Sequence, residues 1–160
     1  MRRKDKEIKD QRLIENVIRA SQVVRLGLAK DNLPYVVPLS FGYDGQAIYF
    51  HGAGEGRKID FMQANPQVCF EFEGIVRLID DASSPCNWSF SFQSVIGYGR
   101  VVELTELDDK VAALQCIVRQ YSSRELHFEA SRVAPVRVWK IEIESLSGKQ
   151  SKDLQEQDLG

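Results

Sequence analysis

The chain has 160 residues, of which 43% are hydrophobic and 28% charged, and its formal net charge is −2. This length suits one domain with a core of its own, and the acidic balance argues against a nucleic-acid binder that relies on bulk charge. No apolar run approaches the ~20 residues of a membrane span, and the basic N-terminus lacks the apolar core of a signal peptide. We therefore expect neither nucleic acid nor membrane as a partner, and a cytoplasmic location.

The N-terminal part predicts a helix followed by a strand. Residues 5–20 have helical periodicity, with Asp5 as a candidate cap. The apolar stripe of this helix consists of Leu13, Ile14, Val17 and Ile18. Residues 23–29 form the first predicted strand, and Asp31-Asn32 turn the chain into the next one.

The stretch from Tyr35 to Lys58 organises the rest of the chain. Residues 35–41 read as a strand, and Asp44-Gly45 is the pair that a type I′ hairpin turn requires. The return strand over residues 46–50 ends on His51, so three antiparallel strands form a predicted meander. Pro38 interrupts the second strand, which indicates an edge, a bulge or a face that meets a ligand ring.

Three glycines and two cations follow this hairpin directly. Gly52, Gly54 and Gly56 precede Arg57 and Lys58, where helical spacing begins. Free backbone N–H groups and the helix dipole would make this place an anion site, most naturally for phosphate. The alternative is that the glycines only form a tight turn and the cations lie on a solvated helix face.

The C-terminal half adds strands and one long helix. Strands are expected over residues 67–73, 88–104 and 135–146, a loop over 80–87, and a bend at Gly97-Tyr98-Gly99. The helix that begins at the two cations is expected to stop at Asn65-Pro66, because proline forbids its continuation. A second helix, after residue 104, is expected to be capped by Thr105 with Asp108. Its core-facing stripe comprises Leu107, Val111, Leu114, Ile117 and Val118.

About six strands with short turns favour a β-barrel decorated with helices. Residues 150–160 form a polar tail that we expect to be disordered.

The cysteines and histidines predict no metal site. Cys69 and Cys116 fall in strand and helix patterns and read as buried small hydrophobes, whereas Cys86 lies in a loop. His51 and His127 are widely separated and lack paired carboxylates. Trp88 and Trp139 could line a pocket, although core packing is the simpler interpretation.

Several ordered blocks resemble a known family. They are residues 1–5 (MRRKD), 34–43 (PYVVPLSFGY), 48–53 (IYFHGA), 56–58 (GRK), 65–70 (NPQVCF), 94–99 (SVIGYG) and 147–149 (SGK). With these blocks the chain resembles the nitroimidazole-resistance-type flavoproteins, within the wider pyridoxamine 5′-phosphate oxidase-like superfamily. The resemblance implies one domain over residues 1–149, a mainly β fold that forms a six-stranded antiparallel split barrel with flanking helices, an FMN cofactor, and a homodimer with shared active sites.

The resemblance also implies which residues meet the cofactor. They are Val36, Val37, Pro38, Leu39, Ser40, Phe50, His51, Arg57, Lys58 and Ser94. Arg57 and Lys58 match the basic residues that hold the phosphate, residues 36–40 match the strand along the isoalloxazine ring, and His51 matches a histidine beside the flavin and is the candidate catalytic residue.

The chain departs from the pattern of the pyridoxamine oxidases in two places, and two classes of function stay open. Ser40 stands where pyridoxamine oxidases carry a basic residue, and their C-terminal Arg/His pattern is missing, which argues against oxidation of pyridoxamine phosphate. We expect either an oxidoreductase passing electrons from reduced FMN to a small organic acceptor or a flavin- or haem-binding module without turnover. Without the resemblance, the pattern favours a capping or packing role for His51 over catalysis, and Ser40 and Ser94 read as barrel-facing polar residues.

Overall fold

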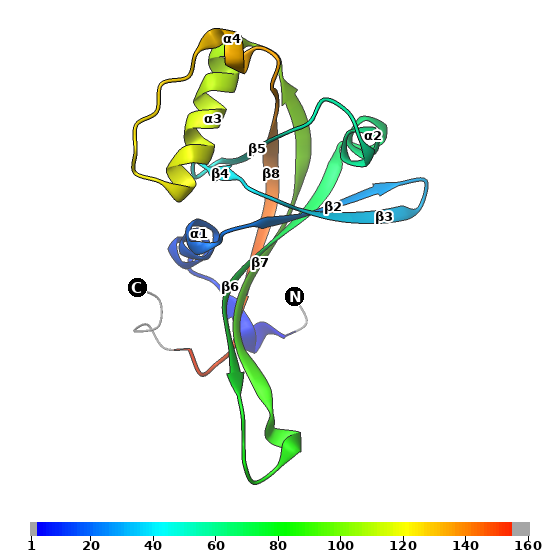
Figure 1. The fold of residues 1–160 in the computed structure, drawn as a ribbon. Coiled ribbons are helices and arrows are strands. Elements are labelled where there is room, and N and C mark those ends of the chain that lie inside the picture. The colour runs from blue at the N-terminus through cyan, green and yellow to red at the C-terminus, as the bar shows by residue number, and fades with distance from the viewer. Residues whose placement is uncertain (1–2, 155–160) are drawn as a thin grey trace.

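The computed structural model describes residues 3–154, which form one antiparallel sheet with helices around it (Figure 1). The strands are β1 (Glu7–Ile8), β2 (Val24–Lys30), β3 (Leu33–Leu39), β4 (Gly42–Tyr43), β5 (Ala47–Gly52), β6 (Gln67–Ile79), β7 (Ser89–Leu104) and β8 (Arg137–Gln150). The helices are α1 (Gln11–Ala20), α2 (Arg57–Ala64), α3 (Leu107–Tyr121) and α4 (Ala130–Val133), with short 3-10 turns η1 (Lys4–Lys6) and η2 (Pro85–Asn87).

The order of the strands closes the sheet into a barrel. Neighbouring strands run β3-β2-β6-β7-β8-β5-β4, and β1 adds to β8. The two end strands, β3 and β4, are consecutive in the chain and only Ser40 and Phe41 separate them. Such a connection spans at most about 11 Å, so the two ends of the sheet lie close together. The predicted split β-barrel is confirmed: six strands have six or more described residues, and β1 and β4 add two each.

The predicted meander over residues 23–50 is wrong in its second half. Within the described sheet β3 pairs with β2 alone, whereas β5 pairs with β4 and β8. Phe41 explains the break, because its side chain is fully buried and its backbone N–H donates to the hydroxyl of Tyr121 at 2.9 Å. The chain therefore turns inward after β3. Pro38 lies on the edge strand of the sheet, as its missing N–H requires.

The type I′ turn lies elsewhere than predicted. Asp31 and Asn32 both have positive φ, 49° and 62°, between the paired residues Lys30 and Leu33. At the predicted site only Gly45 has positive φ, 98°. There the Asp44 carboxylate accepts hydrogen bonds from the N–H groups of Gln46 and Ala47, at 2.8 Å each, and closes the loop itself.

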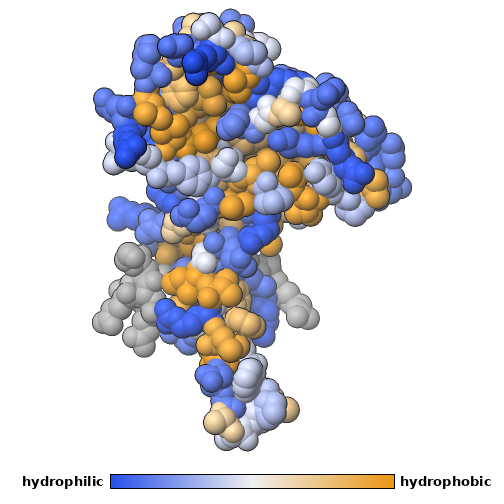
Figure 2. Space-filling view, in the orientation of Figure 1, coloured by the Kyte–Doolittle hydropathy of each residue, from blue (hydrophilic) through white to orange (hydrophobic). Residues whose placement is uncertain are grey.

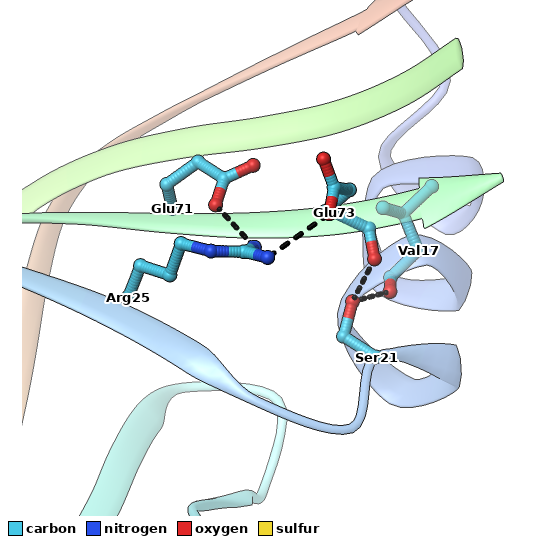
Figure 3. A network of polar contacts seen from close by, with 5 residues as sticks. All are labelled: Val17, Ser21, Arg25, Glu71 and Glu73. Carbon is cyan, nitrogen blue, oxygen red and sulfur yellow. Dashed lines mark hydrogen bonds and ion pairs between the residues drawn. The ribbon is translucent and has the colours of Figure 1, made fainter. Parts of the chain in front are cut away.

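Helix α1 starts later than the sequence predicted. Asp10, not Asp5, is its N-cap and accepts from the N–H of Arg12 at 2.9 Å. Buried Ile14, Val17 and Ile18 form the core-facing stripe. Beyond the helix, the Ser21 hydroxyl lies 2.7 Å from the Val17 carbonyl oxygen and 3.1 Å from that of Glu73, which ties α1 to β6 (Figure 3).

The next strand carries an arginine that bridges two acids of β6. Arg25 of β2 reaches Glu71 and Glu73, each at 3.0 Å, and the two glutamates lie on one face of β6 (Figure 3). All three side chains are at least partly exposed, so the bridge contributes little to stability.

The ends of α2 and α3 follow different rules. Helix α2 stops at Ala64, with Asn65 as C-cap before Pro66, as predicted. Helix α3 has Glu106 as N-cap without a side-chain hydrogen bond, so the predicted Thr105 cap is wrong. The Thr105 hydroxyl instead donates to the Glu106 carboxylate at 3.3 Å.

Two apolar clusters fill the fold. One occupies the barrel interior and includes Phe50, Phe70 and Trp139, and the other lies between α3 and β8 around Leu114 and Val138. Trp139 is a core residue as expected, whereas Trp88 is 54% exposed and belongs to neither cluster.

The β6–β7 hairpin extends far beyond the barrel (Figure 1). We call its distal part, residues 74–91, the arm. Large apolar side chains on the arm stay exposed: Val76, Leu78, Ile79, Trp88 and Phe90. Figure 2 shows orange patches on the part of the arm that is nearer the barrel. Nearer the barrel, the pairing of β7 with β8 shifts between Tyr98 and Gly99, which is the predicted bend. A Cβ at Gly99 would lie 2.4 Å from the Glu142 carbonyl oxygen.

The expected disordered tail is partly folded. Gln150 belongs to β8, Ser151 and Leu154 are buried, and the Ser151 N–H donates to the Phe92 carbonyl at 2.9 Å. The prediction of a disordered tail is therefore wrong for residues 150–154, and residues 155–160 lie outside the described part of the chain.

Among the described residues, no helix is long and apolar enough to span a membrane. The three cysteines are free, with Cys86 exposed and the others half-buried.

Candidate functional site

A loop of residues 52–56, which we call the glycine loop, joins β5 to α2. Gly56 is the N-cap of α2, with φ 120° and ψ 172°, a backbone conformation open to glycine alone. Its carbonyl accepts from the N–H groups of Ile59 and Asp60. The N–H groups of Arg57 and Lys58 stand first in the helix and have no intrahelical acceptor. The positive end of the α2 dipole therefore faces the loop.

Lys58 places a cation against aromatic rings beside this loop. Its ammonium nitrogen lies 5.6 Å from the ring centres of both Phe50 and Trp139, which stack at 5.5 Å and 18°. Burial lowers the pKa of Lys58 below its ordinary value of 10.5. Among the described residues no carboxylate forms an ion pair with Lys58. A half-buried, uncompensated cation favours an anionic ligand.

Arg57 connects the loop to the edge strand β3. Its guanidinium lies 5.7 Å from the ring centre of Tyr35, which packs against Phe61 of α2 at 5.5 Å. Along β3 the burial alternates. Val37 and Leu39 are half-buried with Tyr35, whereas Val36, Pro38 and Ser40 are exposed on the other face.

Arg137 and Glu103 complete the surroundings of the loop. The Arg137 guanidinium donates through Nε and Nη2 to the two Glu103 carboxylate oxygens, at 2.7 and 2.5 Å. Its Nη1 donates to the carbonyl oxygen of Gly54 at 2.6 Å, and the same group lies 5.2 Å from the Trp139 ring centre. The hydrogen bonds from Arg137 lower the pKa of Glu103.

Two predicted site residues lie apart from this group. His51 pairs with Val138 in the sheet, and alternation puts it on the face of β5 that carries Tyr49, opposite to Phe50. Ser94 lies ten residues before Leu104, the residue of β7 that pairs with Val138. This is about 30 Å along the strand, so one chain does not bring Ser94 to Lys58.

A separate cleft of about 550 Å³ lies between α3 and the β4-β5-β8 part of the sheet. Its walls include Tyr43, Tyr49, Cys116 and Lys140. Burial raises the pKa of the Cys116 thiol. The Asp44 carboxylate at its rim accepts the hydroxyl of Tyr49 at 2.8 Å. Among the described residues no three His, Cys, Asp or Glu side chains gather as a metal site would require.

Fold and loop together define a class of protein, a split β-barrel in which a glycine loop and two cations meet at the start of a helix. The chain belongs to the pyridoxamine 5′-phosphate oxidase family, whose profile matches residues 10–150. The resemblance that the sequence suggested is thereby confirmed.

Solved structures agree with this assignment. A candidate 5-nitroimidazole antibiotic resistance protein from Bacteroides thetaiotaomicron VPI-5482 is 30% identical, with a TM-score of 0.80 over 89% of this chain and 85% of that one. An FAD-binding protein from Mesorhizobium loti is 26% identical, with a TM-score of 0.64 over 91% and 97% of the two chains. An uncharacterised protein of Rhizobium meliloti (strain 1021) is 31% identical over 90 residues, 56% of this chain, and the match spans about half of that protein, 52%.

Sequence reasoning found the loop and its two adjacent cations but missed Arg137 and Glu103. The contact between Arg137 and Gly54 joins residues 83 positions apart. No local pattern carries such a contact, and an arginine in an alternating strand reads as an exposed residue. The pairing of β5 with β8 was the information needed to find it.

Proposed function

We propose that the protein binds FMN and passes electrons from the reduced cofactor to a small organic acceptor, in the manner of a nitroreductase. One observation carries the flavin assignment: the ammonium group of Lys58 is half-buried at the start of α2, and no carboxylate of residues 3–154 pairs with it. Together with Arg57 and the free N–H groups of the first helical turn, it suits a phosphate monoester. The flavin-binding relative from Mesorhizobium loti supports the same ligand class.

The residues of the chain fit such a cofactor in two ways. Arg57 and Lys58 would neutralise the phosphate, and the exposed face of β3, with Val36, Pro38 and Ser40, would lie along the isoalloxazine ring. In the described sheet β3 is an end strand, so its outer edge has no neighbouring strand, and Pro38 has no N–H that could pair with one. Bound FMN supplies the redox chemistry, while these side chains orient it and keep it in place.

We further propose a homodimer in which the partner subunit completes each site. The arm exposes Trp88 and Phe90, each to 54%, and β3 exposes Val36 to 62%. Exposed apolar surface of this extent marks an interaction site. Ser94, which lies too far from Lys58 in its own chain, would reach the flavin of the other subunit.

The test has a binding part and a turnover part. FMN should bind the purified protein much more tightly than riboflavin, which lacks the phosphate; equal affinities would contradict the phosphate assignment. The bound flavin is then reduced without oxygen and mixed with a quinone or a nitro compound. Reoxidation faster than with oxygen alone supports an oxidoreductase, whereas equal rates support the alternative of a binding module without turnover.

A further inference from the structure

The three cations around the glycine loop differ in what neutralises them. Lys58 and Arg57 contact aromatic rings, and no carboxylate within the described residues pairs with either. Arg137, in contrast, meets both carboxylate oxygens of Glu103. Glu103 therefore neutralises the charge of Arg137 within the protein, and little net positive charge remains to attract an anionic ligand.

Arg137 has a structural contact that the other two cations lack. Its Nη1 donates to the Gly54 carbonyl at 2.6 Å, in the middle of the glycine loop. Among the described residues, no other hydrogen bond reaches residues 53–55. Arg137 itself is well fixed, since β8 holds its backbone opposite Gly52 and Glu103 of β7 holds two of its nitrogens.

This single contact decides how the loop peptide is oriented. The described chain contains no cis peptide, so the C=O of Gly54 and the N–H of Glu55 point in opposite directions. With the carbonyl directed at Arg137, the Glu55 N–H is directed away from it. Glycines lose more conformational freedom on ordering than any other residue, and a loop with three of them depends strongly on such a contact.

We propose that Arg137, held by Glu103, is a positioning residue for the anion site. It orders the glycine loop and thereby the backbone that leads into α2, and it stays bonded to Glu103 while Arg57 and Lys58 meet the anion. This rests on the proposed function, in which the anion is the phosphate of FMN. The effect of Arg137 is then confined to the part of a ligand that carries the phosphate.

Three variants isolate this role. Arg137→Lys keeps the charge but loses the planar fork that serves Glu103 and Gly54 together. Glu103→Gln weakens the support of Arg137 without removing it. Arg3→Gln is the matched control, because Arg3 contacts Asp5 with the same two-nitrogen geometry, at 2.9 and 2.8 Å. It lies near β1, at the opposite end of β8, about 40 Å along the strand.

The first measurement needs no flavin. Amide hydrogen exchange of residues 53–57 should become at least tenfold faster in Arg137→Lys, less so in Glu103→Gln, and should stay unchanged in Arg3→Gln, with α3 as internal reference. The second measurement compares ligands. FMN affinity should fall at least tenfold in Arg137→Lys while riboflavin affinity stays within twofold.

Unchanged loop exchange, or an equal fall for FMN and riboflavin, overturns the proposal. If the wild-type protein binds neither flavin, the proposed function fails, and inorganic pyrophosphate then serves as the probe. Protection of the loop amides by pyrophosphate in the wild type but not in Arg137→Lys supports the positioning role. Protection that is absent from the wild type, or equal in both proteins, overturns it.

Discussion

The ammonium nitrogen of Lys58 lies 2.5 Å from the point that a Cβ would occupy on Gly52. A side chain at position 52 would therefore displace the end of Lys58, which is flexible, rather than the backbone. We expect Gly52→Ala to fold normally and to bind FMN about fivefold to tenfold more weakly, part of the value of a charge-assisted hydrogen bond.

Gly54→Ala is the control, because its nearest neighbour, the Arg137 Cδ, lies 3.9 Å away and its φ is not positive. Its FMN affinity, measured by fluorescence titration, should stay within about twofold of the wild type. Equal losses in the two variants would show that loop flexibility matters and the position of Lys58 does not.

Removing the cation itself should have a larger effect. A hydrogen bond to a charged group contributes roughly 1.5–3 kcal/mol, so Lys58→Ala should weaken FMN binding about tenfold to a hundredfold. Riboflavin affinity should hardly change, because riboflavin carries no phosphate. Calorimetric titration with both ligands checks this, and a parallel loss for riboflavin would assign Lys58 to general packing against Phe50 and Trp139.

The lowered pKa of Lys58 predicts two pH effects of opposite sign. Burial disfavours its charged form, so this group destabilises the folded state while it is charged. The penalty disappears as the pH rises through the folded pKa toward the unfolded value of 10.5. FMN affinity changes the other way, since loss of the proton removes the charge that the phosphate meets.

The affinity for FMN should therefore decline at a pH below 10.5, the ordinary pKa of a lysine. Titrations from pH 7 to 11 in parallel with Lys58→Arg test this, because arginine keeps its proton over that range. An identical decline in both proteins would mean that another group, or the flavin itself, is responsible.

Light scattering at micromolar concentration should give the mass of a dimer. A stable interface of this kind typically buries more than ~2,000 Å², and the arm offers its exposed aromatic residues for it. Phe90→Ser should dissociate more readily on dilution. Leu126→Ser should not, because Leu126 has a similar exposure, 51%, but lies on the loop after α3. A monomeric wild type would contradict both the dimer and the shared site.

His51→Ala should retain FMN and the fold, because alternation directs residue 51 away from Phe50 and Lys58. The catalytic role of His51 rests on the family resemblance alone, which matches it to a histidine beside the flavin. If His51 delivers a proton to the acceptor, reduction should slow at least tenfold in the variant, since general acid–base help is usually a factor of about 10²–10⁴. His127→Ala, exposed in the loop after α3, is the control. If His51→Ala instead loses flavin while its rate per bound flavin is unchanged, His51 belongs to the cofactor site.

The sequence predicted well what short stretches of chain encode. Helix α2 ends where Asn65-Pro66 require it, and the bend at Gly97-Tyr98-Gly99 coincides with a real change of register. Proline geometry and glycine freedom act within a few residues, so they can be read directly.

Pairing between distant strands was beyond this reasoning. Nothing local in residues 46–52 says that Phe50 faces Trp139, and the meander was therefore expected instead. The same limit hid Arg137, whose part in the site depends on that pairing. Asp44 misled for a different reason: its side chain closes the turn that its backbone was expected to form.

The attachment of β5 also has a kinetic consequence. Besides two-residue β4, its only strand neighbour in the described sheet is β8, whose paired residues lie between 85 and 95 positions later. Contacts of such long sequence separation form slowly, because chain entropy is lost before they stabilise anything. The glycine loop follows β5, so a refolding chain should regain its helical signal well before its affinity for FMN.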